Sequence, residues 1–114
     1  MKQGPALLCG IQFKMRRAAR TDRNHKEIVK GLRQTGCTVL DLSAVGNGCP
    51  DIIVGRAGYN WLFEIKDGEK PKSARQLTMM EKAFFATWRG NVQVVNSLDE
   101  AIKAVNETIK IKEI

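Results

Sequence analysis

The sequence has few cysteine and histidine residues, and this shortage argues against two classes of protein. The cysteines Cys9, Cys37 and Cys49 are odd in number, and together with the single His25 they fit no zinc-binding spacing. A disulfide-stapled secreted scaffold and a structural zinc site are therefore disfavoured. We expect reduced thiols in a cytoplasmic protein.

Long apolar runs are also missing. No stretch approaches the length needed to span a membrane, and residues 5–11 are too short and too broken by glycine to form a convincing signal-peptide core. We therefore expect no membrane association. The chain has 114 residues, of which 43% are hydrophobic and 27% charged, a composition that suits one soluble globular domain.

The shortage of acidic residues leaves an excess of positive charge. There are 12 Asp and Glu against 19 Lys and Arg, which gives a net charge of +7. Nine basic residues lie within the first 35 positions: Lys2, Lys14, Arg16, Arg17, Arg20, Arg23, Lys26, Lys30 and Arg33. A basic face kept for solubility is one explanation, but this clustering exceeds that need and favours nucleic acid as a partner.

The first half of the chain predicts a helix followed by three strands. We expect residues 1–14 to form an arm, because Gly4, Pro5 and Gly10 discourage a continuous helix. A helix capped by Thr21 or Asp22 should stop at Gly36. Strands are expected at 37–42, 50–54 and 60–66, with turns at 46–48 and 55–58, and a polar loop is expected at 67–74.

The second half predicts two helices around a fourth strand. Thr78 and Glu81 have the spacing of a capping box, and Gly90 should end that helix. A strand is expected at 92–95, and Ser97 with Glu100 form a second capping box that opens a third helix. Residues 109–112 alternate in period 2 and suit a helix end or a short edge strand. The predicted order is α-β-β-β-α-β-α in one domain.

The strand at 60–66 carries charged residues where they are costly. Trp61, Phe63 and Ile65 should point to one face, with Glu64 and Lys66 on the other. In a strand so rich in apolar residues, charged groups need a partner or a bound ion. Asp51 lies thirteen positions before Glu64, so the two carboxylates should converge from adjacent strands of a hairpin.

This arrangement resembles the signature of the PD-(D/E)xK nuclease superfamily, and is most similar to small VRR-NUC-type phage nucleases and Holliday junction resolvases. The resemblance covers about residues 15–105 and rests on three blocks in order. They are Asp-x-Asn-x-x-Glu-Ile-Val with Leu-x-x-x-Gly-Cys-x-Val-Leu-x-Leu at 22–42, Gly-x-Gly-x-Pro-Asp-Ile-Ile-Val-Gly at 46–55, and Leu-Thr … Phe-Phe-x-x-Trp-x-Gly-x-Val-x-Val-Val-x-Ser at 77–97.

The resemblance implies a fold and an activity. The fold would be α/β, a restriction-endonuclease-like αβββαβ core with a mixed central sheet flanked by helices, over residues 15–114. The activity would be DNA hydrolysis dependent on Mg²⁺ or Mn²⁺, in a bacterial or phage-infected cell. The ion would be held by Asp51, Glu64 and the carbonyl of Ile65, since hard cations prefer oxygen ligands. Lys66 would act in catalysis, with help from Glu27.

Each of these assignments has a plainer alternative. Glu64 and Lys66 suit an ordinary solvent-facing pair, and Asp51 suits a turn acid that begins a strand. Glu27 suits an exposed helix flank equally well. The capping box is a sufficient explanation for Glu81, where many relatives carry glutamine, and Gln76 is out of register with that pattern. We interpret Cys49 as a packing residue and His25 as a surface residue.

DNA contacts are expected from two basic groups. Lys70, Lys72 and Arg75 follow the catalytic strand in a loop, and Arg16, Arg17 and Arg20 lie in the N-terminal cluster. The main hypothesis is a metal-dependent endonuclease, with branched or junction DNA as a candidate substrate. The alternative is a non-catalytic nucleic-acid-binding module of the same fold. A sequence-specific restriction enzyme is less favoured, because the chain is short for an added recognition domain.

We also expect a homodimer. One domain presents one active site, whereas symmetric cutting of a duplex or junction needs two, and two-fold symmetry is the commonest closed assembly. The candidate contacts are the apolar residues that have no place in the predicted core: Leu7, Leu8, Ile11 and Phe13 of the arm, and the tail at 109–114.

Overall fold

The computed structural model describes residues 21–112. The elements run α1 (His25–Gln34), β1 (Thr38–Asp41), β2 (Ile52–Arg56), β3 (Tyr59–Ile65), a 3₁₀ turn η1 (Lys72–Arg75), α2 (Met79–Thr87), β4 (Val92–Val95) and α3 (Leu98–Lys112). The predicted α/β fold with the order α-β-β-β-α-β-α is confirmed. Within residues 21–112, no helix is both long and apolar enough to cross a membrane.

The four strands form one mixed sheet in the order β1-β2-β3-β4. The β1–β2 and β2–β3 pairs are antiparallel, and β3–β4 is parallel. The β2–β3 hairpin turns at Ala57 and Gly58, both with positive φ, the backbone twist that two-residue hairpins favour. The parallel partner β4 is reached through η1 and α2, because parallel strands need a long crossover connection.

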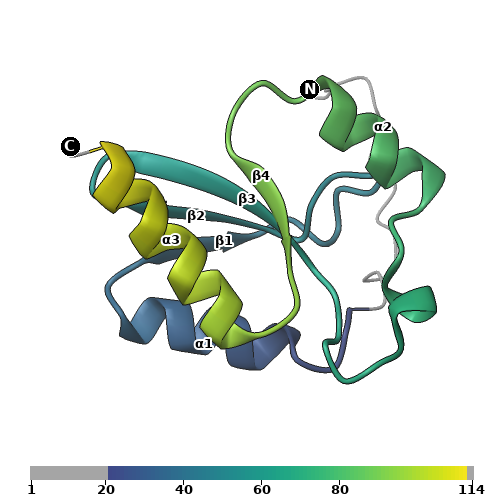
Figure 1. The fold of residues 1–114 in the computed structure, drawn as a ribbon, viewed down its shortest axis with the longest axis horizontal. Helices are drawn as coiled ribbons and strands as arrows, with labels where there is room; N and C mark the ends of the chain where they lie inside the picture. The colour runs from purple at the N-terminus through teal and green to yellow at the C-terminus, as the bar shows by residue number, and fades with distance from the viewer. Residues whose placement is uncertain (1–20, 113–114) are drawn as a thin grey trace, which may run out of the picture.

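One face of the sheet carries the hydrophobic core. Helices α1 and α3 lie side by side beneath this face (Figure 1). Trp61, Phe63 and Ile65 of β3 point into it, as the period-2 pattern predicted, and pack in one cluster with Leu32 of α1 and Val105 of α3. The polar end of Trp61 is satisfied there, since its Nε1 donates to Thr108 Oγ1 at 3.0 Å.

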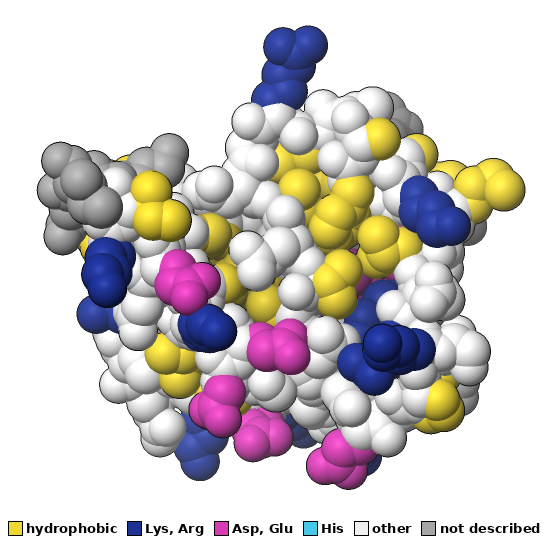
Figure 2. Space-filling model, viewed as in Figure 1, with side chains coloured by type: hydrophobic (Ala, Val, Ile, Leu, Met, Phe, Trp, Pro, Cys, Tyr) yellow, Lys and Arg dark blue, Asp and Glu magenta, His cyan; other side chains and the backbone are white. Residues whose placement is uncertain are grey.

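Among residues 21–112, α2 is the helix that lies on the side of the opposite face (Figure 1). None of the residues of α2 is fully buried, although Phe84 and Trp88 stack on each other. Figure 2 shows hydrophobic side chains gathered in a hollow between β4 and α2, with charged groups around it. The side chains of Glu64 and Lys66 lie on this second face near the start of α2, where Lys66 contacts Glu81.

Helix α1 begins later than predicted. Neither Thr21 nor Asp22 caps it through a side chain; the helix starts at His25, with Asn24 at the N-cap position. Asn24 instead donates its side-chain amide to the carbonyls of Lys66 and Asn96, both at 3.1 Å. These bonds tie the entry to α1 to the ends of β3 and β4. The predicted cap was wrong because hydrogen bonds to residues far along the chain fix the position of this segment.

The other helix boundaries follow the capping signals closely. The Thr78–Glu81 capping box is present in full at α2, which ends at Thr87 rather than at Gly90. At α3 the box is half formed: Ser97 Oγ accepts the N–H of Glu100, but the Glu100 carboxylate takes the N–H of Asn96. Residues 109–112, left open between helix and strand, continue α3.

Candidate functional site

Asp51, Glu64, Ile65 and Lys66, all predicted site residues, line one cavity of about 500 Å³ on the second face of the sheet. It lies where β2 begins, β3 ends and α2 begins. Its lining residues are Thr21, Asp22, Ser43, Asn47, Gly48, Cys49, Asp51, Glu64, Ile65, Lys66, Thr78, Met80 and Glu81. Four carboxylates and one ammonium group therefore face one cavity in a chain of net charge +7. We refer to it below as the acidic pocket.

Asp51 is held by the neighbouring strand at two points. Its backbone N–H donates to the carbonyl of Phe63 at 3.0 Å, and its Oδ2 accepts the N–H of Ile65 at 2.8 Å. The two bonds flank Glu64 along β3 and fix the Asp51 side chain beside it. Asp51 thus does more than begin a turn, since its carboxylate takes the place of a carbonyl in the β2–β3 pairing.

Glu64 is buried, with only 4% of its surface exposed. Its Oε2 lies 3.5 Å from Lys66 Nζ, whereas its Oε1 is buried and accepts no hydrogen bond from residues 21–112. The alternative of a solvent-facing Glu64–Lys66 pair is therefore wrong. Burying a carboxylate oxygen without a hydrogen-bond donor costs desolvation free energy that no bond offsets, and such atoms are rare in folded proteins. This oxygen therefore needs an explanation.

Lys66 bridges two acids from different elements. Its Nζ lies 3.0 Å from Glu81 Oε1 on α2 and 3.5 Å from Glu64 Oε2 on β3, and 13% of its side chain is exposed. Glu81 Oε1 also accepts the backbone N–H of Thr78 within the capping box. One carboxylate thus orders the start of α2 and holds Lys66 in place. The capping explanation for Glu81 is correct but incomplete.

The electrostatics of the pocket disfavour two negative charges side by side. Burial, together with the charges of Asp51 and Glu81, raises the pKa of Glu64 to about 9. Burial also raises the pKa of Asp51, despite the hydrogen bond from Ile65. Burial lowers the pKa of Lys66, but the bonds and charges of Glu81 and Glu64 outweigh it, so that pKa is raised and the ammonium is kept.

The donor set of the pocket fits a hard divalent cation. Within residues 21–112, no three His, Cys, Asp or Glu side chains are grouped closely enough to hold a metal ion by themselves. Mg²⁺ keeps several of its waters, however, and is commonly bound through one or two carboxylates. Asp51 and Glu64, with its unpartnered oxygen, supply two, and Ile65 also lines the cavity.

Glu27 is not brought to this pocket. It lies on an exposed flank of α1 and lines a separate hollow with Arg23 and Asp67. The helix turns its other side inward, where Ile28 and Leu32 are buried. The expected help from Glu27 at the metal site is therefore not supported by its position, and the exposed-flank alternative fits.

Asp22 lines the acidic pocket instead, which the sequence did not suggest. The residue was expected to cap α1, but the helix begins three positions later and leaves Asp22 in the preceding segment. Its charge acts on Asp51 in the direction that raises the Asp51 pKa. The only sequence signal was an acid just ahead of the helix, which capping explained equally well.

His25 differs from its predicted role, whereas Cys49 lies beside the site, as the sequence suggested. His25 is not on the surface: only 5% of it is exposed, and its Nε2 lies 3.0 Å from Asp41 Oδ2. Cys49 lines the acidic pocket, and burial together with the charges of Glu64 and Asp51 raises the pKa of its thiol. The thiol is kept protonated and is a poor nucleophile there.

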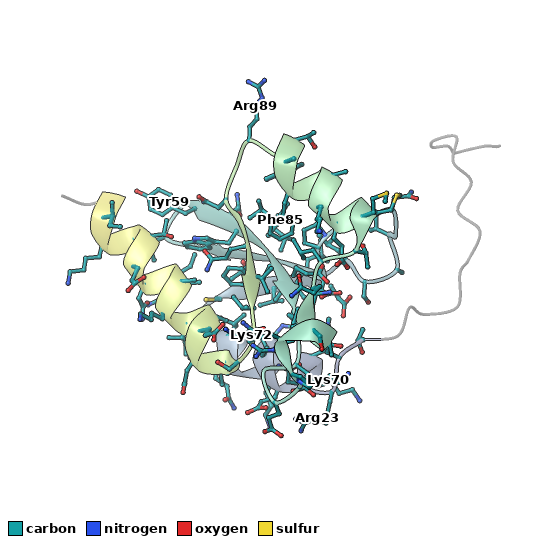
Figure 3. The ribbon with its side chains drawn as sticks, turned by 45° about the vertical axis from the view of Figure 1, so that its right-hand side comes forward. Arg23, Tyr59, Lys70, Lys72, Phe85 and Arg89 are labelled. Carbon is teal, nitrogen blue, oxygen red and sulfur yellow. The ribbon has the colours of Figure 1, made fainter. Side chains whose placement is uncertain are left out.

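The basic residues expected to bind DNA lie outside the pocket or outside the described residues. Arg16, Arg17 and Arg20, like the arm at 1–14, precede residue 21. Lys70 and Lys72 are exposed beside the pocket-bearing strand, near Arg23 (Figure 3). Arg75 is anchored by a bond from its Nε to the carbonyl of Lys70 at 2.9 Å, which closes the loop.

Comparison with known proteins returns no relative. No protein-family model matches the chain, and no curated protein or solved structure matches it.

Proposed function

We propose that this protein is a metal-dependent endonuclease that hydrolyses DNA phosphodiester bonds in the acidic pocket. The observation that carries the proposal is the buried Oε1 of Glu64, which accepts no hydrogen bond from residues 21–112 and lies beside Asp51, on the same face as Lys66. Two adjacent buried carboxylates repel phosphate and destabilise the fold unless a cation joins them. A site built only to bind nucleic acid has no use for that arrangement.

The roles of the residues follow from their contacts. Asp51 and Glu64 would hold Mg²⁺ or Mn²⁺, with the carbonyl of Ile65 as a further oxygen ligand. When bound there, the ion would supply an activated water and would neutralise charge on the scissile phosphate. Lys66, kept charged by Glu81 and Glu64, donates to the phosphate or orients the attacking water. Asp51 is positioned for this by the N–H of Ile65.

A cleavage assay tests the proposal. Duplex, single-stranded, flap and four-way DNA are incubated with the protein and Mg²⁺ or Mn²⁺, with EDTA as the control. We expect cleavage that needs the ion and is lost in Asp51→Ala and Glu64→Ala, while both variants still bind DNA. Binding without cleavage by the wild-type protein under every metal condition would instead favour the non-catalytic module.

We also propose that the active form is a homodimer, because symmetric cutting needs two active sites. Of the suggested contacts, Leu7, Leu8, Ile11 and Phe13 lie outside the described residues, whereas Ile111 at the end of α3 is 67% exposed. Light scattering at micromolar concentration should give about twice the chain mass of 12.7 kDa. A mass near 12.7 kDa both with and without DNA would refute the dimer.

A further inference from the structure

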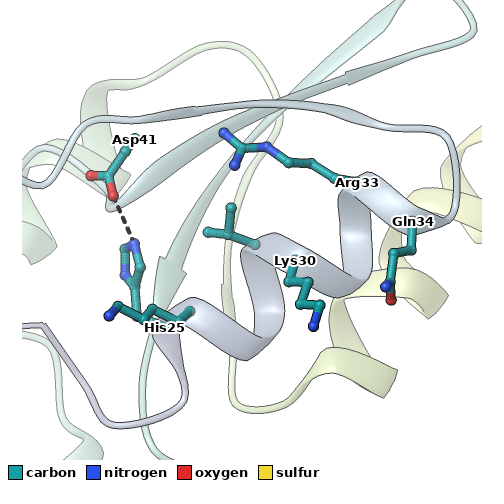
Figure 4. Close-up of a pocket in the computed structure, with 7 residues that line it drawn as sticks. His25, Lys30, Arg33, Gln34 and Asp41 are labelled. Carbon is teal, nitrogen blue, oxygen red and sulfur yellow. Dashed lines mark hydrogen bonds and ion pairs between the residues drawn. The ribbon is translucent and has the colours of Figure 1, made fainter.

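A second cavity, of about 430 Å³, lies between α1 and the edge strand β1 and is strongly basic. Its lining residues are His25, Lys26, Val29, Lys30, Arg33, Gln34 and Asp41. Lys26, Lys30 and Arg33 recur at helical spacing, so they project from one face of α1. We refer to this cavity as the α1 groove. Figure 4 shows Arg33 reaching toward β1, whereas Lys30 extends from α1 on the side away from β1.

Within the described part of the chain, the basic side chains of the α1 groove are not neutralised by ion pairs. Among residues 21–112, Lys26, Lys30 and Arg33 form no salt bridge; Arg33 Nη2 donates to the carbonyl of Val39 at 2.9 Å. The one acid in the lining, Asp41, is occupied: its Oδ2 faces His25, and its Oδ1 accepts the N–H and Oγ–H of Ser43. Burial raises the pKa of Asp41, but these bonds outweigh it and lower that pKa.

The α1 groove adjoins the acidic pocket. Asp41 lines the groove, and Ser43, which bonds to it at 2.8 and 2.6 Å, lines the pocket. The end of β1 and the segment that follows it therefore contribute to the linings of both cavities. The pocket itself offers a phosphate chain one ammonium group among four acidic side chains. Affinity for that chain has to come from cationic groups next to the pocket.

We propose that the α1 groove binds the phosphate backbone of the DNA strand that enters the acidic pocket. Lys26 and Arg33 are seven residues apart, about 10 Å along the helix axis. Phosphates on one strand advance about 3.4 Å each, so the stripe spans about three of them. The contacts are to backbone only and carry no sequence preference. This inference rests on the proposed nuclease function and adds where the substrate strand lies.

The test compares two charge-removing variants of the full chain. Lys26→Ala with Lys30→Ala removes two groove cations that lack ion pairs, and leaves Arg33, which also bonds to β1. The matched control is Lys103→Ala with Lys110→Ala on α3. These lysines are exposed and lie in a hollow that also contains Asp99 and Glu107. Duplex DNA binding is measured in EDTA from 50 to 200 mM salt.

We expect the groove variant to flatten the slope of log K against log salt by about 1.8. Lowering the salt from 200 to 50 mM raises the affinity of both proteins. A slope difference of about 1.8 makes the fold-increase roughly twelve times smaller for the groove variant than for the wild type. The α3 control should match the wild type, and Lys26→Arg with Lys30→Arg should restore the slope.

The outcome separates this inference from the nuclease proposal. If the wild-type protein binds and cleaves DNA but the groove and α3 variants have the same slope, the groove is not a contact and the nuclease proposal survives. If the groove variant loses affinity as expected but no protein cleaves, the binding track stands and the nuclease proposal fails. Wild-type protein that does not bind DNA overturns both.

Discussion

Two carboxylates of this protein have the same exposure and opposite surroundings. Asp67 and Glu64 are each 4% exposed. Asp67 bonds to Arg23 at 3.1 and 3.2 Å and to the backbone N–H of Glu69 at 2.9 Å. Glu64 has one oxygen 3.5 Å from Lys66 and the other without a partner. The hydrogen bonds from Glu69 and Arg23 lower the pKa of Asp67, whereas that of Glu64 is raised to about 9.

The difference shows which acid the fold uses for itself. Asp67 is paired with Arg23, which is itself 61% exposed, and the pair ties the segment after β3 to the entry of α1. Among residues 21–112, Glu64 accepts no comparable set of hydrogen bonds. A position that keeps an ionisable group despite burial and nearby negative charge is typical of functional sites rather than structural ones.

The largest expected effect separates the two acids by activity. Glu64→Gln should lower the rate of DNA cleavage by more than about 100-fold. Removing a residue that only supports a metal ligand costs at most about that much, so the loss of a ligand itself should cost more. Asp67→Asn should leave cleavage per folded molecule unchanged, although it loses a charged bond to Arg23. Equal losses of activity in the two variants would erase the distinction between a structural and a functional carboxylate.

The cations that contact the two acids, Lys66 beside Glu64 and Arg23 beside Asp67, allow a second comparison. Lys66→Ala should reduce kcat by roughly 100-fold, because a donor to the developing charge is lost. Metal affinity should change little by comparison, since Asp51 and Glu64 remain. Arg23→Ala is the matched control, because it removes the cation of the structural pair and should leave kcat as it is. A selective loss of metal binding in Lys66→Ala would contradict this role.

The pH dependence of stability should have opposite signs for the two acids. Glu64 binds its proton more tightly in the folded state, so its contribution to stability falls as pH rises from about 4.5 to about 9. A shift of this size corresponds to about 6 kcal/mol at most, and we expect about 2–3 kcal/mol once water enters the pocket. For Asp67 the lowered pKa means stability that is present at neutral pH and lost as pH falls below about 4.

Denaturation of metal-free protein across this pH range checks the signs. Glu64→Gln should remove the decline on the alkaline side, and Asp67→Asn should remove part of the decline on the acid side. A wild-type curve that rises between pH 5 and pH 9 would mean that the Glu64 pKa is not raised.

The features of this fold that depend on neighbouring residues could be predicted from the sequence. The alternation of Trp61, Phe63 and Ile65 against Glu64 in one short strand admits only one arrangement of faces, and the structure has it. The capping box of Thr78 and Glu81 and the strand at 92–95 also depend on neighbouring residues, and both are as expected. The convergence of Asp51 and Glu64 needed only a hairpin, which Gly58 makes easy.

What the sequence could not supply depends on partners far along the chain. Asn24 bonds to Lys66 and Asn96, so α1 starts late and Asp22 faces the acidic pocket. His25 is buried, and its Nε2 lies 3.0 Å from a carboxylate oxygen of Asp41 on the next element. No local pattern distinguishes a histidine with such a partner from an exposed one, nor an acid that caps a helix from one that precedes it.

The smallest expected effect concerns the second role of Glu81. Thr78→Ala should destabilise the protein by about 1 kcal/mol through loss of the α2 cap. It should also slow cleavage severalfold, because the helix start that carries Glu81 holds Lys66. Ser97→Ala removes the equivalent bond at α3, away from the pocket, and should cost similar stability without slowing cleavage. Equal rates in the two variants would limit Glu81 to capping.

Metal binding tests the central claim most directly, because the claim is that the Glu64 carboxylate is a ligand for a divalent cation. Mn²⁺ is titrated into the wild-type protein and into Glu64→Gln by calorimetry at pH 7, in two buffers of different ionisation enthalpy. Since the pKa of Glu64 is raised to about 9, the wild-type protein should release about one proton per ion bound. Glu64→Gln should bind weakly and release none. Binding with equal affinity and equal proton release in both proteins would contradict the account.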